Sequence, residues 1–265
     1  MTPSHRPHLT SSMDSRGVAT VTLDRPAQHN AFDDQLLADL ACALHQMARR
    51  GARVLILAAN GPSFSAGADL AWMKRMANYS YEENLADARA LADTLATLNQ
   101  LPLPTIARVQ GAAFGGAVGL ISCCDFAIAS EQAKFRLSEV RLGLIPATIS
   151  PYVIAAIGAR AARRYFLSAA AFDAQQANRL GLVSEVVDPA DLDRQVEALV
   201  AQLLANGPQA LSSAKALIFE VAGQDIDQAL IDRTCHSLAR SRASSEGQEG
   251  LTAFLEQRQP NWTEG

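Results

Sequence analysis

The sequence contains only four cysteines, and none of them belongs to a pattern that binds zinc. There is no CxxC pair and no cysteine–histidine spacing of the kind that structural zinc sites use. Cys123 and Cys124 lie in an apolar run, where a cysteine usually acts as a small hydrophobic side chain. We therefore expect reduced structural thiols and no metal site.

Long apolar runs are also absent. No uncharged apolar stretch reaches the ~20 residues that a membrane-spanning helix needs. Residues 1–16 are polar and lack the apolar segment of a signal peptide. The sequence predicts a cytoplasmic protein with no membrane partner and a flexible N-terminus at residues 1–16.

An excess of positive charge is missing too. The formal net charge is −4 and the pI is about 5.7, which argues against nucleic acid as a partner, because phosphate binding favours a basic surface. Neither GxxxxGK[ST] nor GxGxxG occurs, so the sequence does not support a binding site for a nucleoside triphosphate or a dinucleotide. Hydrophobic residues make up 49% of the 265-residue chain, enough for a large core.

What is present is an alternation of strand-like and helix-like segments. Residues 17–23, 54–58, 105–109 and 126–129 are apolar and strand-like, and helical patterns at residues 33–49, 82–100 and 115–124 separate them. This order predicts an α/β fold with parallel strands. No strand is expected after about residue 187. We therefore divide the chain into a core at residues 17–195 and a C-terminal helical subdomain at residues 196–265.

Two bends made of small residues each follow a predicted strand, at residues 64–70 and 111–117. Small side chains at such bends leave backbone N–H groups free to point at a ligand. Two N–H groups from separate loops can hold a carbonyl oxygen on which negative charge develops. Each bend by itself is a weak signal, and the first by itself is more typical of an ordinary strand-to-helix turn, so the pair carries more weight than either one.

A single carboxylate, Glu139, lies in the largely apolar run at residues 135–152. A carboxylate against an apolar wall has a raised pKa and serves as a general acid or base. The competing interpretation is a surface glutamate that pairs with Arg136 or Arg141. Composition does not decide between these two interpretations of Glu139. No serine or cysteine lies in the setting of a nucleophile elbow.

Together, these segments resemble the enoyl-CoA hydratase/isomerase (crotonase) superfamily from about Gly17 to Trp262. The motifs that carry the resemblance lie at residues 24–32, 64–70, 104–107, 111–125, 138–146 and 249–258. The resemblance implies a spiral of ββα units followed by a C-terminal helical trimerisation region. It also implies a homotrimer, or a hexamer of paired trimers.

The resemblance also implies site residues. Ala68 and Gly116 match the two main-chain N–H donors that hold the thioester oxygen of an acyl-CoA. Because CoA is part of the substrate, no separate cofactor is expected. The positions that match the CoA-binding regions of the superfamily are Arg25, Ala27, Ala66, Gly67, Asp69, Phe254 and Arg258, the last two often acting across a subunit boundary.

One position departs from the pattern of the superfamily's hydratases, which use two glutamates. Glu139 matches the second glutamate, but Gly119 stands where the first would be. One glutamate can take a proton from water and return one to the substrate in turn. It can equally move one proton along an allyl system, which is isomerase chemistry.

Residues 71–76, 80–85 and 145–152 resemble a bacterial branch that hydrates 3-methylglutaconyl-CoA, and a similar terpenoid branch acts on carboxygeranoyl-CoA. Both substrates carry a second carboxylate. Our hypothesis is that Gly119 leaves room and removes a negative charge, so that a distal carboxylate is tolerated. The candidates to hold this carboxylate are Ser122, Ser138, Arg141 and Tyr152.

The first prediction is therefore a hydro-lyase that adds water reversibly across the 2,3 double bond of a branched or carboxylated enoyl-CoA. A Δ3,Δ2-enoyl-CoA isomerase, or another superfamily member with one glutamate, is the alternative. A non-catalytic acyl-CoA-binding scaffold is the second alternative. An RNA-binding scaffold is disfavoured by the acidic pI.

Overall fold

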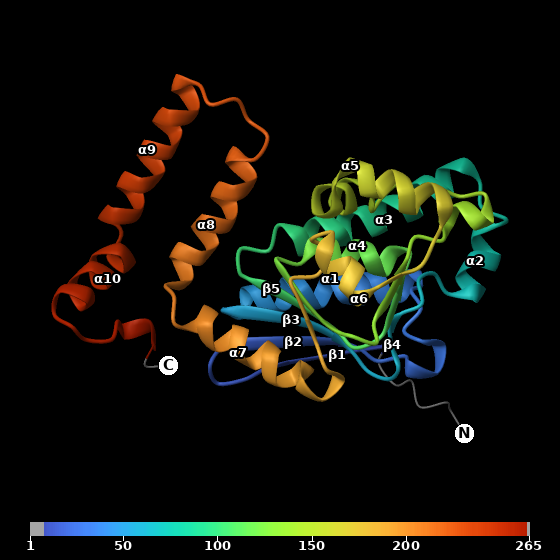
Figure 1. Cartoon of the computed structure of the whole chain (residues 1–265), viewed down its shortest axis with the longest axis horizontal. Coiled ribbons are helices and arrows are strands. Elements are labelled where there is room, and N and C mark those ends of the chain that lie inside the picture. Colours follow the sequence, from blue (N-terminus) through green and yellow to red (C-terminus); the bar gives the residue numbers. More distant parts are fainter. Residues whose placement is uncertain (1–7, 264–265) are drawn as a thin grey trace.

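A six-stranded sheet forms the centre of the computed structural model, which describes residues 8–263 (Figure 1). Its strand order is β1-β2-β3-β5-β7-β10, and all neighbours are parallel except β1 and β2. The predicted α/β class with parallel strands is confirmed. The strands are β1 (Leu9–Met13), β2 (Val18–Leu23), β3 (Val54–Ala59), β5 (Thr105–Val109), β7 (Phe126–Ser130) and β10 (Glu185–Val187).

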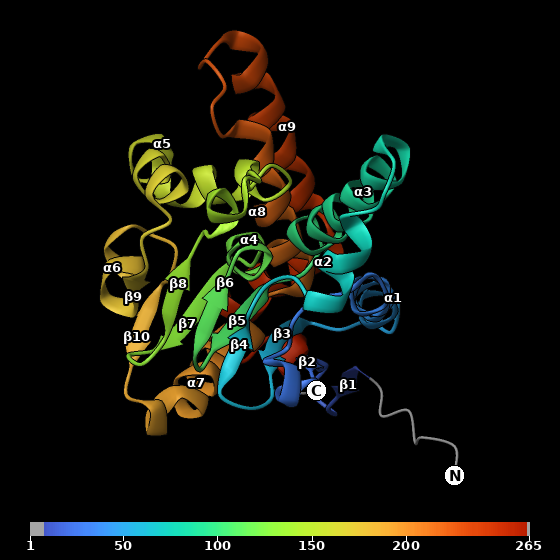
Figure 2. The same ribbon diagram turned by 90° about the vertical axis from the view of Figure 1, so that its right-hand side faces the viewer.

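A second, smaller sheet stands beside the first (Figure 2). Its order is β4-β6-β8-β9, with bounds β4 (Ser63–Ser65), β6 (Ala112–Phe114), β8 (Lys134–Arg136) and β9 (Phe172–Asp173). Strands β3, β5 and β7 of the large sheet are each followed by one strand of the small sheet and then by helix. The expected succession of ββα units is confirmed.

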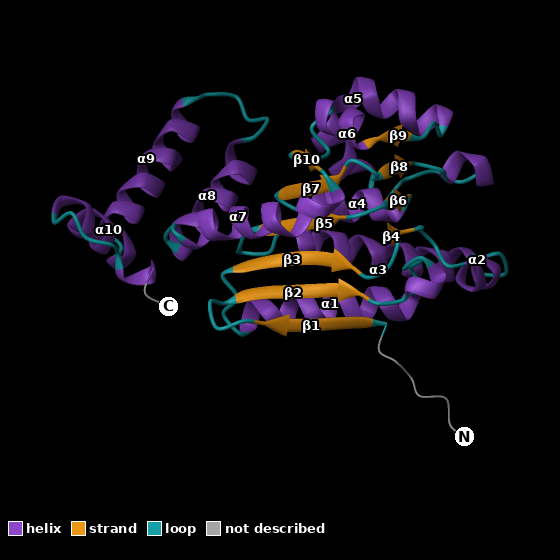
Figure 3. Ribbon diagram, turned by 60° about the horizontal axis from the view of Figure 1, so that its bottom comes forward, coloured by secondary structure: helices purple, strands orange, loops and turns teal. Residues whose placement is uncertain are grey.

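Helices cover both faces of the large sheet (Figure 3). One face carries the larger core cluster, and its helices are α1 (Asp34–Arg49), α2 (Leu70–Met76), α3 (Tyr81–Asn99), α4 (Gly116–Cys123), α5 (Ser150–Ser168) and α6 (Ala174–Arg179). Short 3-10 helices are η1 (Pro26–Gln28), η2 (Glu139–Leu142), η3 (Pro189–Asp191) and η4 (Asn261–Thr263). Several helices start at residues that cap them, as Asp69 does for α2.

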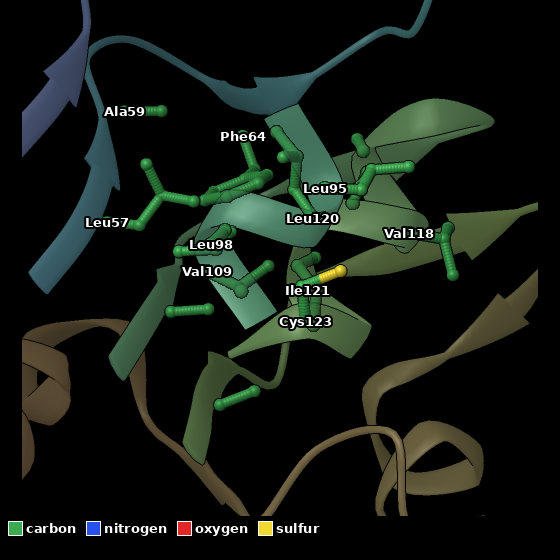
Figure 4. Close-up of a cluster of buried hydrophobic side chains, with 14 of the residues drawn as sticks. Leu57, Ala59, Phe64, Leu95, Leu98, Val109, Val118, Leu120, Ile121 and Cys123 are labelled. Atoms are coloured by element: carbon green, nitrogen blue, oxygen red, sulfur yellow. The ribbon is translucent and has the colours of Figure 1, made fainter. Parts of the chain in front are cut away.

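Helix α4 lies in the middle of the larger core cluster. Leu120 and Ile121 of α4 lie among Phe64 and Leu95 from neighbouring elements (Figure 4). Buried apolar side chains surround an eight-residue helix that carries no charge. Since such packing fixes a helix firmly, the N-terminus of α4 is held in one position relative to the sheets.

The opposite face of the large sheet is covered by α7 (Leu192–Leu204), which packs on side chains of β2, β3, β5 and β7 in a separate cluster. Beyond it, α8 (Pro208–Val221), α9 (Gln228–Ala243) and α10 (Ser245–Leu255) form a helical arm at one end of the molecule (Figure 1). The predicted boundary at residues 195/196 therefore falls inside α7, and the arm begins at Pro208.

The N-terminal prediction needs a correction. Leu9–Met13 form β1, which pairs antiparallel with β2 from Leu9↔Leu23 to Met13↔Ala19. Their backbone groups complete an edge of the sheet, so this part of the segment predicted as flexible is ordered. Residues 1–7 lie outside the described residues. Among residues 8–263, no helix is both long and apolar enough to cross a membrane.

Candidate active site

The two predicted bends, at residues 64–70 and 111–117, lie next to each other because each begins with a short strand, and these two strands pair. β4 and β6 run parallel, with Ser63 opposite Ala112 and Ser65 opposite Ala113. Gly67 in the first bend has φ +91°, and a Cβ there would lie 3.1 Å from the Phe114 carbonyl oxygen. Only glycine fits this backbone conformation at so close an approach. The small sheet thus brings together two loops that are about 45 residues apart in sequence.

The N–H of Ala68 is free in the first bend. Phe32 makes a parallel bridge to Ala68, in which its N–H donates to Gly67 O and its carbonyl accepts from Asp69 N, both at 2.7 Å. In such a bridge, the residue between the two bonded neighbours turns its own N–H away from the partner. Ala68 is exposed, and no acceptor for its N–H exists within residues 8–263.

The N–H of Gly116 is free in the second bend. Gly116 is the first residue of α4, so its N–H has no acceptor within the helix. Gly115 before it has φ 55° and ψ −123°, and the Gly115 N–H donates to Arg136 O at 2.8 Å. The positive end of the helix dipole lies behind the Gly116 N–H. This N–H can therefore donate to an oxygen that gains negative charge.

Glu139 begins η2 and lies beside the second bend. A Cβ at Gly115 would stand 3.1 Å from Glu139 Oε1, and Glu139 Oε2 is buried without a hydrogen-bond partner. In the described part of the chain, no ion pair joins Glu139 to Arg136 or Arg141. Burial raises the pKa of Glu139 above its ordinary value. Of the two interpretations left open by the sequence, the paired surface glutamate is wrong.

Glu139 also predicts a pH dependence of stability. A carboxyl whose pKa is raised in the folded state stabilises the fold fully below its ordinary pKa of 4.5 and loses that effect as pH rises through the folded pKa. Glu139→Gln removes this loss. We expect the variant to gain stability relative to the parent between pH 4 and pH 7, measured by thermal unfolding at both values. A stability difference that does not change with pH would contradict the assignment.

Gly119 does not leave room in a pocket, contrary to our hypothesis. It is buried, and a Cβ built on it would lie 2.3 Å from Ile149 Cγ2, 2.8 Å from Ile149 Cβ and 3.5 Å from Leu95 Cδ2. Ile149 is 2% exposed. The space that a side chain at position 119 would need is therefore filled by isoleucine. Residues 116 and 119 share one helix face, so this apolar wall adjoins the candidate donor.

The four candidates for a distal carboxylate differ in their surroundings. Ser122 Oγ donates to Val118 O at 2.9 Å within its own helix. The side chain of Arg141 is exposed, whereas Ser138 and Tyr152 are half-buried. Burial raises the pKa of Tyr152. None of these observations selects one of the four, so the carboxylate-binding residue stays a prediction.

Arg25 and Asp69, two predicted CoA-binding residues, connect the two sides of the first bend. The Arg25 guanidinium donates to Asp33 Oδ2 at 2.7 Å, to Asp69 Oδ2 at 3.3 Å and to Ala31 O at 3.0 Å. Asp69 Oδ1 meanwhile accepts from the first N–H groups of α2. The Arg25 side chain is only 13% exposed. Its charge is therefore already paired within the protein.

Arg25→Met tests whether the ion pairs of Arg25 with Asp33 and Asp69 stabilise the fold. The change leaves Asp33 and Asp69 without their cation in a poorly hydrated place, so we expect a loss of about 3 kcal/mol in the free energy of unfolding. Chemical denaturation measures it. Arg75→Met is the matched control, because Arg75 pairs with Asp34 on the surface and its loss should cost less than about 1 kcal/mol. Equal losses of unfolding free energy in the two variants would contradict the stabilising role of the Arg25 ion pairs.

The remaining predicted CoA contacts lie in two separate regions. Ala27 in η1 and Ala66, which precedes Gly67, are both exposed. Phe254 is 81% exposed on α10, and Arg258 forms a two-point ion pair with Glu249 at 2.7 and 2.9 Å. Helix α10 lies at the opposite end of the molecule from α2 (Figure 1). Within one chain, Phe254 and Arg258 are not brought to the bends.

Comparison with known proteins identifies the family to which this chain belongs. The sequence pattern of enoyl-CoA hydratase/isomerase matches residues 13–265. The chain belongs to this family. A crotonyl-CoA hydratase of Syntrophomonas wolfei is 32% identical over 92% of this chain and 94% of its own length. An enoyl-CoA isomerase/hydratase of Mycosarcoma maydis is 34% identical over 96% and 95%, respectively.

Solved structures agree with the family assignment. An enoyl-CoA hydratase from Shewanella pealeana is 48% identical, with a TM-score of 0.94 over 97% of both chains. This enoyl-CoA hydratase/isomerase therefore has the crotonase fold, and enoyl-CoA hydratase/isomerase activity is supported at the level of the family. The names of these three relatives do not specify 3-methylglutaconyl-CoA.

Sequence reasoning missed two residues beside the site, Phe32 and Ile149. Phe32 gave no signal beyond an apolar residue in a loop motif. Ile149 lay in a segment that we used only to recognise a branch of the superfamily. Each acts through a partner that is distant in sequence, Ala68 for Phe32 and Gly119 for Ile149. No local pattern of residues indicates such contacts.

Proposed function

We propose that this enzyme adds water reversibly across the 2,3 double bond of a branched or carboxylated 2-enoyl-CoA, such as 3-methylglutaconyl-CoA. The observation that supports this is a half-buried carboxylate, Glu139, whose Oε2 is buried without a hydrogen-bond partner and which lies beside the second of two adjoining bends with free N–H groups. The N–H groups of Ala68 and Gly116 then hold the thioester oxygen. Glu139 handles the proton.

In the proposed reaction, negative charge develops on the thioester oxygen as a C–O bond forms between water and C3. The two N–H groups stabilise this charge, and each such donor typically contributes ~3 kcal/mol to the transition state. Glu139 takes a proton from the attacking water and delivers a proton to C2, so that its own charge is restored. The raised pKa of Glu139 suits both transfers. CoA is proposed to lie along the exposed surface at Ala27 and Ala66.

Isomerisation is the second candidate function. The position of Ile149 next to Gly119 favours it. Ile149 fills the space beside Gly119, so no second acid can act from that position. In an isomerase, Glu139 would remove a proton from C2 of a 3-enoyl-CoA and return one to C4, with the same enolate held by the two N–H groups. One carboxylate is sufficient for that proton shuttle.

A panel of CoA esters separates these functions. We expect hydration of 3-methylglutaconyl-CoA to exceed that of crotonyl-CoA and of a long-chain 2-enoyl-CoA, followed as loss of the conjugated thioester absorbance. Gain of that absorbance from a 3-enoyl-CoA would instead identify an isomerase. Tight binding of the esters without conversion of any would identify a non-catalytic scaffold and overturn both proposals.

The role of the Gly116 N–H can be tested with a matched pair of variants. Proline is tolerated at the first position of a helix and lacks the N–H, so Gly116→Pro deletes the donor with little cost to α4. We expect kcat to fall about 100-fold or more. Gly116→Ala keeps the N–H and meets the same neighbour, the Phe32 ring, at 3.3 Å. Equal kcat values for the two variants would contradict the role.

The helical arm supports the predicted homotrimer or hexamer. Ile218 on α8 is 64% exposed, and Phe254 and Leu255 on α10 are 81% and 79% exposed. A cavity of about 870 Å³ opens between α8, α9 and α10, away from the bends. Such apolar exposure is typical of a surface that binds another chain. Light scattering in solution tests the assembly, and a cytoplasmic location stays a prediction.

A further inference from the structure

Phe32 contacts both bends of the candidate active site. Its backbone makes the parallel bridge to Ala68, with hydrogen bonds of 2.7 Å to the residues on either side of it. Its ring lies against Gly116, where an added Cβ would stand 3.3 Å from Phe32 Cε2 and 3.4 Å from Cδ2. Phe32 therefore contacts both residues, Ala68 and Gly116, whose N–H groups we assign to the thioester oxygen.

The loop that carries Phe32 is itself firmly held. Asn30 is fully buried and has φ 54°, a left-handed conformation that asparagine tolerates better than most residues. Its Nδ2 donates to Asn60 O at 2.8 Å and to Ser63 O at 2.9 Å, and its Oδ1 accepts from Arg25 N at 2.8 Å. These bonds attach the loop to the start of β4, two residues before Phe32.

The separation of two donors matters because a small displacement weakens the hydrogen bonds to a developing oxyanion. Such donors act best at 2.7–3.1 Å from that oxygen, and a misplacement of about 1 Å can cost about 100-fold in rate. Glycine at position 116 offers no side chain that could fix its own distance to the first bend. The Phe32 ring supplies a rigid surface at that point, and it is 2% exposed.

We propose that Phe32 is a positioning residue, which sets the distance between the Ala68 and Gly116 N–H groups through its backbone on one side and its ring on the other. The inference rests on the proposed function, since it takes both N–H groups as donors to one thioester oxygen. Phe32 does not touch the reacting atoms in this role. Its loss should weaken polarisation of the thioester while leaving recognition of CoA intact.

Phe32→Leu is the test variant, because it keeps the backbone bridge and removes the ring that reaches Gly116. The probe is butyryl-CoA labelled with ¹³C at the thioester carbonyl, a saturated ester that cannot be hydrated. On the parent enzyme, we expect the carbonyl resonance to move downfield on binding. In Phe32→Leu, that movement should shrink, kcat should fall about 10-fold or more, and affinity measured by calorimetry should change less than 3-fold.

Phe172→Leu is the matched control. Phe172 is also buried, at 6% exposure, but its ring stacks on Phe135 of β8 and is tilted against Tyr165 of α5, and neither of these ring contacts lies in a bend. It should lose comparable stability without losing carbonyl polarisation. Phe32→Met keeps a long apolar side chain but lacks the rigid ring, so it should lose part of the downfield shift and of kcat, and it replaces Phe32→Leu as the test if the leucine variant does not fold.

The outcomes separate the two proposals. If the parent enzyme neither moves the carbonyl resonance nor converts any enoyl-CoA, the proposed function fails. If the parent moves it and the folded Phe32 variants move it equally, the function stands and the positioning role is overturned. The positioning role is also overturned if Phe172→Leu loses as much polarisation as Phe32→Leu, since general loosening of the fold would then explain both.

Discussion

Glu139→Gln is expected to lower kcat by about 100-fold or more while the affinity for a CoA ester stays close to that of the parent. The amide is nearly isosteric with the carboxyl group but cannot carry a proton between water and substrate. Glu139 Oε2 has no protein partner to lose, so the surrounding structure should remain intact. Initial rates with the best ester of the panel, together with calorimetric binding of butyryl-CoA, measure the two effects separately.

The pH profile adds a second readout of Glu139. If the carboxylate acts first as a base, kcat/KM should rise with pH through a pKa above the ordinary value of 4.5, because burial disfavours the charged form. Glu131→Gln, on the exposed turn before β8, is the control and should leave both rate and profile unchanged. Turnover near the parent level in Glu139→Gln would remove Glu139 from the mechanism.

Gly119→Glu is expected to prevent stable folding. A Cβ at position 119 would overlap with Ile149 at 2.3 Å, and the displaced atoms include a Cβ that is fixed to the backbone. Overpacking of this kind typically costs about 1–3 kcal/mol, and a carboxylate buried beside Leu95 and Ile149 adds a further penalty. Soluble yield and the unfolding midpoint measure the effect. A variant as stable as the parent would show that Ile149 moves aside readily.

The double variant Gly119→Glu with Ile149→Ala distinguishes an effect on substrate preference from an effect on stability. Alanine at position 149 removes the Cγ2 atom at 2.3 Å and keeps the Cβ at 2.8 Å, so it relieves the larger part of the overlap with the new side chain. We expect the double variant to be more stable than the sum of the single changes predicts, since two residues in contact couple. Its preference among carboxylated and straight-chain esters then tests our original hypothesis on Gly119, which the single variant cannot do if it does not fold.

The long elements were predictable because their signals are local. The strand-like pattern at residues 17–23 predicted β2, and the helical spacing of apolar residues at 33–49 predicted α1. The resemblance implied ββα units, but the residue patterns did not locate the strands of the small sheet, for the opposite reason. Strands such as Ser63–Ser65 and Ala112–Phe114 have three residues each, too few for any periodic pattern. Strand β1 is polar along its exposed residues, and only its pairing with β2 identifies it.

The sequence by itself determined which groups this enzyme has available. It has a single acid in an apolar run, two bends where glycine permits positive φ, and no glutamate at position 119. These are properties of one residue and its immediate neighbours along the chain. Tertiary structure alone decided which groups are free to act. It pairs Arg25 with two carboxylates, fills the space beside Gly119 with Ile149 and places Phe32 between the bends. Such contacts join segments far apart in sequence, because packing in three dimensions selects neighbours that no local pattern records.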